Sequence, residues 1–296
     1  MSNTLKSTVE LAGYQILIFT DLDGSLLDHN NYSFEPAVPL LQELEEHSIP
    51  VICCTSKTLA ELLPLREILN NRHPFIVENG AGVFIPKGYF VGLDAGELLN
   101  TEAQWPQLMS DDEGYLGFSF CQPRVHWQHL LQQLPSNMQS NYRSFQSMGI
   151  RGIIDATGLS PEKAEQANQR LFSEPLLWQG SEEVKANATT LLKQLGANVL
   201  QGGRFVHISG ACNKATALNW LAALYQRNCS APISSIAIGD SDNDISMLEV
   251  ADRALVIRSP AHTPPQLERS EQVYLSHAFG PDGWVEGIQF FLQEHS

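Results

Sequence analysis

The sequence lacks paired cysteines, long apolar runs and any excess of basic residues. Its five cysteines form no CxxC pair, so we expect no disulfide framework in a chain of 296 residues. Apolar runs stay far shorter than the ~18–20 residues of a membrane span. Residues 1–15 have no positively charged start followed by an apolar segment, as a secretory leader would. These absences favour a cytoplasmic protein without a membrane partner.

Basic residues are scarce, because 18 Lys and Arg residues stand against 33 Asp and Glu residues. The formal net charge of −15 disfavours nucleic acid and anionic lipid as partners. Hydrophobic residues make up 43% of the chain, which is enough for a substantial core. A small anionic partner would therefore need a site whose local charge opposes that of the whole molecule.

An alternation of short apolar runs and helical patterns predicts an α/β fold at both ends of the chain. The first part predicts strands at 15–20, 49–56 and within 74–86, and helices at 36–47 and 57–69. The last part predicts a helix at 214–226, strands from 233 and at 251–260, and a helix after the turn at 280. The apolar runs do not alternate with polar residues, which is typical of a parallel sheet buried on both faces.

After about residue 90, the middle of the chain no longer shows this alternation of apolar runs and helical patterns. Residues 149–179 combine a strand, a turn and a helix, and residues 181–209 predict a helix followed by a strand pair. We therefore predict a parallel-sheet core domain formed by residues 1–90 and 206–296. Residues 91–205 would form an α+β domain inserted into it.

Two of the predicted strands end in acidic residues. Asp21 and Asp23 follow the first strand, and Asp240 and Asp244 follow the apolar run that starts at 233. Ligands of parallel sheets gather at the carboxyl ends of the strands, so Asp21, Asp23 and Asp240 are expected to converge. Close carboxylates repel one another unless a cation neutralises them, and Mg²⁺ prefers such oxygen ligands. One acidic run alone is typical of a solvated turn, but two runs in equivalent positions favour a magnesium site.

A hydroxyl and a lysine accompany the acids. Thr55 ends the second predicted strand, where its hydroxyl and the backbone N–H groups of the next helix could bind an anion. Considered alone, Thr55 is equally typical of a helix cap. Lys214 begins a later helix, where a cation opposes the helix dipole. A surface position explains such a lysine, and so does a bound phosphate.

Taken together, these motifs resemble the haloacid dehalogenase (HAD) superfamily of aspartyl phosphotransferases. The order is DxD at 21–23, Thr55, Lys214, and GDxxND at 239–244. The resemblance implies a HAD-like Rossmannoid core in which Asp21 is the nucleophile and Asp23 the general acid and base. It also implies metal ligation by Asp21, the backbone carbonyl of Asp23, Asp240 and Asp244, with Mg²⁺ as the cofactor. Thr55 and Lys214 would hold the phosphoryl oxygens, and Asn243 would support the phosphate side.

The place of the insertion, between the third strand and Lys214, is similar to that of the C2B cap in the IIB branch of the superfamily. Several stretches resemble the mannosyl-3-phosphoglycerate phosphatase family within this branch: "TSKT" (55–58), "PFIVENGAGVFIP" (74–86), "DATGLSPEKAEQANQRLFSEPLLW" (155–178), "GGRFVHISGACNKATAL" (202–218) and "GPDGWVEGI" (280–288). The stretch from Arg170 to Pro175, RLFSEP, is the most informative of these, because caps select substrates.

This second resemblance implies a set of substrate-binding residues. Arg170 and Arg204 would pair with a substrate carboxylate, and Glu174 would accept hydrogen bonds from sugar hydroxyls. Structural ion pairs and turns explain the same residues without a ligand. His207, on the strand "RFVHIS", is expected to be part of the structure and not of the chemistry. The full candidate set comprises Ser56, Lys57, Asn79, Gly80, Arg170, Ser173, Glu174, Arg204 and Asn243.

The resulting hypothesis is a Mg²⁺-dependent phosphatase with a small phosphorylated substrate. It would hydrolyse mannosyl-3-phosphoglycerate to mannosylglycerate, a compatible solute, through an aspartyl-phosphate intermediate. Glucosyl-3-phosphoglycerate, sucrose phosphate and general sugar phosphates are alternative substrates within the same branch. A phosphomannomutase-type phosphotransferase uses the same pair of aspartates. A binding protein without catalysis is disfavoured, because all four motifs are complete.

Overall fold

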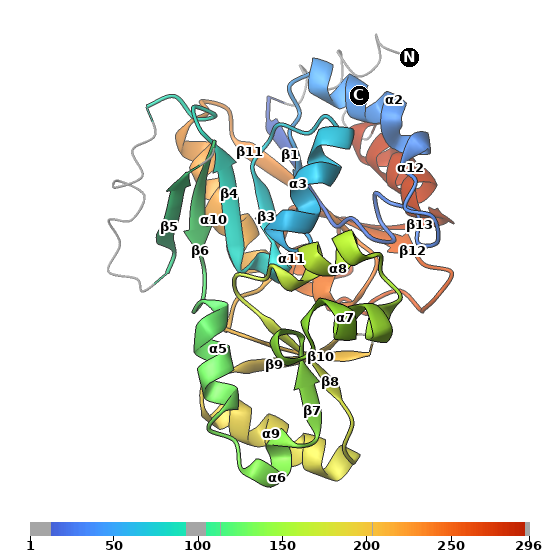
Figure 1. Ribbon diagram of the computed structural model, residues 1–296. Coiled ribbons are helices and arrows are strands. Elements are labelled where there is room, and N and C mark those ends of the chain that lie inside the picture. The colour runs from blue at the N-terminus through green and yellow to red at the C-terminus, as the bar shows by residue number, and fades with distance from the viewer. Residues whose placement is uncertain (1–12, 93–104, 113, 203, 294–296) are drawn as a thin grey trace.

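The computed structural model describes residues 13–92, 105–112, 114–202 and 204–293 (Figure 1). A five-stranded sheet in the order β13-β12-β11-β1-β2 lies at its centre. Its strands are β1 (Gln15–Thr20), β2 (Val51–Cys53), β11 (Ile233–Gly239), β12 (Arg253–Arg258) and β13 (Val273–Phe279). Every neighbouring pair is parallel, which confirms the predicted α/β class.

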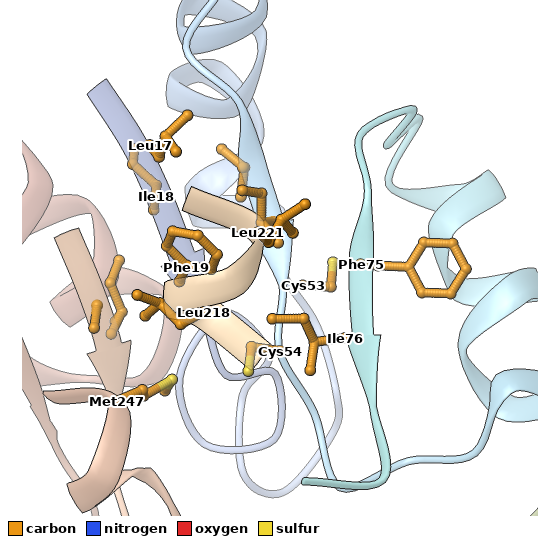
Figure 2. Packing of buried hydrophobic residues seen from close by; sticks show 14 of the residues in the cluster. Leu17, Ile18, Phe19, Cys53, Cys54, Phe75, Ile76, Leu218, Leu221 and Met247 are labelled. Carbon is orange, nitrogen blue, oxygen red and sulfur yellow. The ribbon is translucent and has the colours of Figure 1, made fainter. Parts of the chain in front are cut away.

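Burial along β1 explains why this segment is an uninterrupted apolar run. All residues from Ile16 to Thr20 are buried, so the sheet is covered on both faces and leaves no polar side. In Figure 2, the side chains of Phe19, Leu218 and Leu221 meet in this core. Cys53 and Cys54 are buried there as small apolar residues, and burial raises the pKa of both thiols.

Helices connect and cover the strands of the core. They are η1 (Glu35–Ala37), α2 (Val38–Glu46), α3 (Leu59–Ile68), η2 (Glu78–Gly80), α10 (Lys214–Arg227), η3 (Asp242–Asp244), α11 (Ile245–Val250) and α12 (Gly280–Gln293). Thr58 caps α3, because its hydroxyl accepts from the N–H of Glu61 while the Glu61 carboxylate accepts from the N–H of Thr58. The predicted helices at 36–47, 57–69 and 214–226 are confirmed within a few residues at each end. None of the described helices is both long enough and apolar enough to cross a membrane.

A second sheet, in the order β3-β4-β6-β5, extends the core. Its strands are β3 (Phe75–Val77), β4 (Gly82–Pro86), β5 (Gln107–Asp112) and β6 (Tyr115–Ser119). A bridge between Cys54 and Ile76 links it to the parallel sheet, and Phe118 of β6 packs on Trp220 of α10. Residues 107–119 therefore join the core sheets, although the predicted boundary at residue 91 assigned them to the inserted domain.

The inserted part has its own sheet and core, and it forms the lower half of Figure 1. Its antiparallel sheet has the order β7-β8-β10-β9. Its elements are α5 (Arg124–Leu131), α6 (Ser136–Gln139), β7 (Tyr142–Ser144), α7 (Phe145–Thr157), α8 (Pro161–Asn168), β8 (Glu174–Trp178), α9 (Glu182–Gln194), β9 (Asn198–Gly202) and β10 (Phe205–Ser209). We propose residues 121–210 as the cap domain, because β10 pairs with both β8 and β9.

Candidate active site

Three predicted site residues follow neighbouring strands of the parallel sheet. Strand β1 lies between β11 and β2, so Asp21 after β1 is flanked by Asp240 after β11 and by Thr55 after β2. The N–H of Asp21 donates to the carbonyl of Ile238 at 2.8 Å, which continues the sheet pairing to the site. Parallel strands end at the same edge of the sheet, and this geometry gathers the functional side chains there.

The carboxylates of Asp21, Asp240 and Asp244 form a buried cluster at this edge. One oxygen from each lies within 4.8 Å of the others. The second Asp244 oxygen accepts hydrogen bonds from the N–H groups of Asp240 and Ser241, both at 3.1 Å. Asp244 therefore shapes the turn after β11 and at the same time presents an oxygen to the cluster.

Lys214 is fully buried beside this cluster. Its Nζ donates to Asp21 Oδ1 at 2.7 Å and to Asp244 Oδ1 at 2.6 Å. Asn213 caps the start of α10 by accepting from the N–H of Thr216. Gly80 allows this start to approach closely, because a Cβ at residue 80 would overlap with the carbonyl oxygen of Asn213. Gly80 thus positions Lys214 and does not line the cavity described below.

The cluster holds more negative charge than Lys214 neutralises. Burial raises the pKa of Asp21 to about 8, and the charge of Asp244 adds to this while Lys214 opposes it. Burial and Asp244 also raise the pKa of Asp240, although His262 Nε2 lies 3.2 Å from its Oδ2. Burial alone would lower the pKa of Lys214, but Asp21 and Asp244 together raise it. A buried set of oxygen donors with excess negative charge fits a hard divalent cation such as Mg²⁺.

Asp23 lies outside this carboxylate cluster, contrary to the expected convergence of Asp21, Asp23 and Asp240. Its side chain is 41% exposed, and its Oδ2 lies 2.6 Å from Lys57 Nζ. Gly24, at φ +84°, turns the chain directly after it, where a Cβ would overlap with Asp240 Oδ2. Burial alone would lower the pKa of Lys57, but the charge of Asp23 and its hydrogen bond raise it. Asp28, in the same loop, accepts from the N–H groups of residues 30 and 31 in an exposed turn.

Thr55 and Asn79 connect β2 with the turn after β3. Thr55 is buried, and its Oγ1 accepts from the N–H of Lys57 at 3.1 Å, which leaves its hydroxyl hydrogen able to donate. The N–H of Asn79 donates to the carbonyl of Thr55 at 2.9 Å, and Asn243 Nδ2 donates to Asn79 Oδ1 at 3.1 Å. These bonds bring three candidate residues from separate segments into one network.

A cavity of about 840 Å³ lies between the core and the inserted domain. Five of the predicted substrate-binding residues line it: Ser56, Asn79, Arg170, Ser173 and Asn243. Sequence reasoning missed Ser241 and His262, which also line it. His207, which was expected to be part of the structure, is a lining residue as well. His207 and Ser209 are two positions apart on β10, so the alternation of side chains along a strand is the signal that places both on one face.

Glu78 joins the inserted domain to the core next to this cavity. Its buried carboxylate accepts from the N–H groups of Leu171 and Phe172, at 2.7 and 3.3 Å, and from Ser173 Oγ at 2.5 Å. Glu78 and Asn79 both have positive φ, at 46° and 59°, a conformation that costs energy in residues other than glycine. Backbone strain thus accompanies the contact between the domains.

Besides Lys57 and Gly80, two further predicted substrate-binding residues do not line the cavity. Glu174 is fully buried, and its carboxylate accepts from Arg124 Nε at 2.5 Å, from Gln128 Nε2 at 2.9 Å and from the N–H of Gln146 at 2.9 Å. These donors occupy the oxygens that were expected to bind sugar hydroxyls. Arg204 is exposed and donates through Nη1 to the carbonyl of Ala156. The structure therefore brings neither residue to a substrate.

Comparison with known proteins identifies the family of this site. A family model described as haloacid dehalogenase-like hydrolase matches residues 18–91 and 179–261, which is more than half of the chain. The chain belongs to this family of haloacid dehalogenase-like hydrolases. The match contains Asp21, Asp23, Thr55, Lys214 and Asp240. The hydrolase family and the geometry of its acidic cluster therefore agree, although the match leaves out most of the inserted domain.

Solved structures share the complete fold of this hydrolase. A protein of Thermoplasma acidophilum has 17% sequence identity and a TM-score of 0.61 over 94% of this chain and 99% of its own. The sucrose-phosphatase of Synechocystis sp., solved with sucrose and phosphate, has 16% identity and a TM-score of 0.54 over 94% and 98%. A Bacteroides thetaiotaomicron protein described among the HAD phosphatases has 15% identity and a TM-score of 0.61 over 95% and 96%. At these identities the likeness extends to the fold alone.

Proposed function

We propose that this hydrolase is a Mg²⁺-dependent phosphatase whose substrate is mannosyl-3-phosphoglycerate. The observation that carries the phosphatase assignment is the convergence of Asp21, Asp240 and Asp244 beside Lys214, at the sheet edge next to the cavity. The side chains of these aspartates and the backbone carbonyl of Asp23 would hold the metal. When bound, Mg²⁺ neutralises the carboxylates and the charge of the phosphoryl group.

The reaction proceeds in two transfers on Asp21. An oxygen of the Asp21 carboxylate attacks phosphorus, the ester P–O bond breaks, and Asp23 gives its proton to the departing alkoxide. Asp23 then takes a proton from water as that water attacks phosphorus. The bond between Asp21 and phosphorus breaks, and inorganic phosphate leaves. The Lys57 ammonium, 2.6 Å from Asp23 Oδ2, orients the Asp23 carboxyl group for both steps.

Thr55 and Lys214 stabilise the phosphoryl group during transfer. Lys214 is held on two carboxylates without solvent contact, so its charge is fixed before the substrate arrives. The Thr55 hydroxyl, whose hydrogen is able to donate, supplies a neutral donor. Preorganised donors of this kind act strongly, because the site does not need to reorganise as charge develops.

The choice of substrate rests on the cap and on the resemblance of residues 170–175 to the mannosyl-3-phosphoglycerate phosphatases. Arg170 brings a positive charge to the cavity of a molecule whose net charge is −15. A glycosyl phosphoglycerate carries a carboxylate besides its phosphate, so this charge has a partner in the substrate. The cavity volume of about 840 Å³ suits a disaccharide-sized molecule. We propose that the reaction takes place in the cytoplasm.

Phosphate release from a panel of substrates tests this proposal. The panel holds mannosyl-3-phosphoglycerate, glucosyl-3-phosphoglycerate, sucrose phosphate and mannose 6-phosphate, each with Mg²⁺ and with a chelator. We expect the highest kcat/KM for mannosyl-3-phosphoglycerate and no release with the chelator. Equal and weak rates on every member would refute the substrate, and conversion of mannose 6-phosphate to mannose 1-phosphate would favour a mutase.

Asp21→Asn tests the nucleophile, with Asp28→Asn as the matched control in the same loop. We expect Asp21→Asn to lose at least about a thousandfold in kcat, because the amide does not form the acyl-phosphate bond. Asp28→Asn should keep the wild-type rate, since its side chain binds only its own turn. Full Mg²⁺-dependent activity in Asp21→Asn would disprove the mechanism.

A further inference from the structure

The cap wall of the cavity carries a guanidinium that is only partly paired. Arg170 is 11% exposed at its side chain, and its Nη1 donates to Ser173 Oγ at 3.0 Å. Its Nε is buried and has no hydrogen-bond partner. The nearest carboxylate oxygen is Glu78 Oε2, at 3.7 Å from Nη1, and the Glu78 carboxylate already accepts from three other donors. Glu78 therefore leaves part of the Arg170 charge unpaired, and the Nη2 of Arg170 makes no hydrogen bond in the part of the chain that the structure describes.

His207 lines the same cavity from strand β10. It lies opposite Pro175 in the pairing of β10 with β8, and it is half-buried. Burial and the charge of Arg170 lower its pKa to about 3, so the ring is neutral at every physiological pH. A neutral imidazole has one N–H donor and one acceptor nitrogen. In the part of the chain that the structure describes, this ring makes no hydrogen bond.

Unpaired donors at a cavity wall point to a ligand group that accepts hydrogen bonds. Leaving a buried polar group without a partner is energetically costly, so such groups persist where a ligand completes them. Arg170 offers a charged donor and His207 a neutral one, and no carboxylate of the cap competes for them, because Glu174 is occupied by Arg124 and Gln128. An acceptor with negative charge matches this pair better than a hydroxyl does.

We infer that Arg170 and His207 form a carboxylate-binding subsite and that His207 determines specificity for substrates with a carboxylate on the leaving group. This inference rests on the proposed function, in which the phosphoryl group lies at Asp21 and Lys214. The carboxylate then binds at the cap, and His207 donates one hydrogen bond to it beside the Arg170 ion pair. A sugar phosphate without a carboxylate leaves both side chains unpaired, which penalises its binding.

The test compares His207→Phe, which keeps the ring shape, with His207→Gln, which keeps a donor. Both are assayed with mannosyl-3-phosphoglycerate and with p-nitrophenyl phosphate, which has no carboxylate. We expect His207→Phe to raise the KM for the first substrate at least tenfold more than the KM for the second. His207→Gln should recover most of this difference. His129→Phe, an exposed cap histidine on α5, is the matched control and should not change the ratio of the two KM values.

Competitive inhibition separates this subsite from the proposed function. Mannosylglycerate and mannosylglycerol, which differ in the carboxylate, are tested as inhibitors of p-nitrophenyl phosphate hydrolysis. We expect the wild type to prefer the carboxylate by at least tenfold and His207→Phe to lose that preference. Equal inhibition by the two compounds in the wild type, or an unchanged preference in His207→Phe, would overturn the subsite. A wild type that shows the preference but releases phosphate equally from all sugar phosphates would overturn the proposed function alone.

Discussion

At the scale of single residues, Asp21, the proposed nucleophile, illustrates how a catalytic charge conflicts with stability. Its carboxylate is buried beside Asp244, and only Lys214 offsets the repulsion between them. A neutral side chain of the same shape would relieve this repulsion in the absence of metal. Active sites commonly carry such destabilising arrangements, because the reaction requires the charge that the fold would otherwise exclude.

This conflict predicts a pH-dependent gain in stability for Asp21→Asn in the metal-free protein. The pKa of Asp21 rises from 3.8 to about 8 on folding. The folded state therefore binds its proton more tightly, and this contribution to stability is lost as the pH rises from about 4 through about 8. Asp21→Asn has no proton to lose. We therefore expect its free energy of unfolding to exceed that of the wild type by about 1–3 kcal/mol at pH 8.

Urea unfolding in a chelating buffer between pH 5 and pH 9 measures this difference. The gap between Asp21→Asn and the wild type should widen as the pH rises, while Asp28→Asn should follow the wild-type curve. A constant gap at all pH values would contradict the buried, raised pKa.

Sequence reasoning reached the core residues of the site and two cap residues that line the cavity, Arg170 and Ser173, but it did not place Glu174 and Arg204. Asp21, Thr55 and Asp240 follow adjacent strands, so their convergence comes from the general geometry of parallel sheets. The surroundings of Glu174 depend on donors from α5 and α7, and no local pattern in the sequence reports these contacts. The cavity position of His207 likewise depends on how the cap docks on the core.

At the scale of elements, the approach of η2 to α10 decides where Lys214 lies. Gly80 is at φ +92° and contacts the start of α10 without a side chain between them. The same turn holds Glu78, which bonds to the cap, and Asn79, which bonds to Asn243. This one short turn thus positions Lys214, contacts Asn243 and holds the inserted domain.

Gly80→Ala tests this packing, and Gly88→Ala is the matched control. Both glycines have positive φ, but a Cβ at residue 88 meets no atom within 4 Å. We expect Gly88→Ala to lower the free energy of unfolding by about 1 kcal/mol, which is the effect of the backbone conformation alone. Gly80→Ala should cost more than about 3 kcal/mol, because the backbone of Asn213 must move.

Unfolding by urea gives the two stabilities, and phosphate release gives the effect on Lys214. We expect at least a tenfold loss of kcat in Gly80→Ala alone. Equal effects of the two substitutions would exclude a role for this close approach.

The elements themselves were largely predictable, but their grouping was not. Strand β1 and helix α10 were predicted because an apolar run and a helical stripe are local signals. Strand β6 joins the core by pairing with β4 and packing on Trp220, and β5 joins it by pairing with β6. The contacts of β6 are between distant segments. The predicted boundary at residue 91 relied on the local alternation of strand and helix patterns. This signal does not report pairing between distant segments, so the boundary left both strands out of the core.

At the scale of the whole molecule, metal binding should stabilise the fold. The oxygens of Asp21, Asp240 and Asp244 come from two separate parts of the chain and meet only in the folded state. We therefore expect Mg²⁺ to bind the native protein in preference to the unfolded chain, which would add about 2.7 kcal/mol to the free energy of unfolding at a hundredfold excess over Kd. We expect Tm to rise with Mg²⁺ by several degrees and to return after chelation.

Calorimetry of the wild type and Asp240→Asn measures this effect, with sodium chloride at equal ionic strength as the control. Asp240→Asn should lose most of the rise, since it removes one oxygen ligand with its charge. A rise of the same size in Asp240→Asn would show that the ion acts elsewhere.

The bonds of Glu78 also bear on how freely the cap can be exchanged between relatives. Leu171, Phe172 and Ser173 donate to a carboxylate that belongs to the core and not to the inserted segment. A chimera that transplants residues 121–210 onto another core would leave these donors without an acceptor unless that core supplies an acid in the same turn. The cap and the turn after β3 therefore depend on each other. A new substrate range would require paired changes in the cap and in this turn.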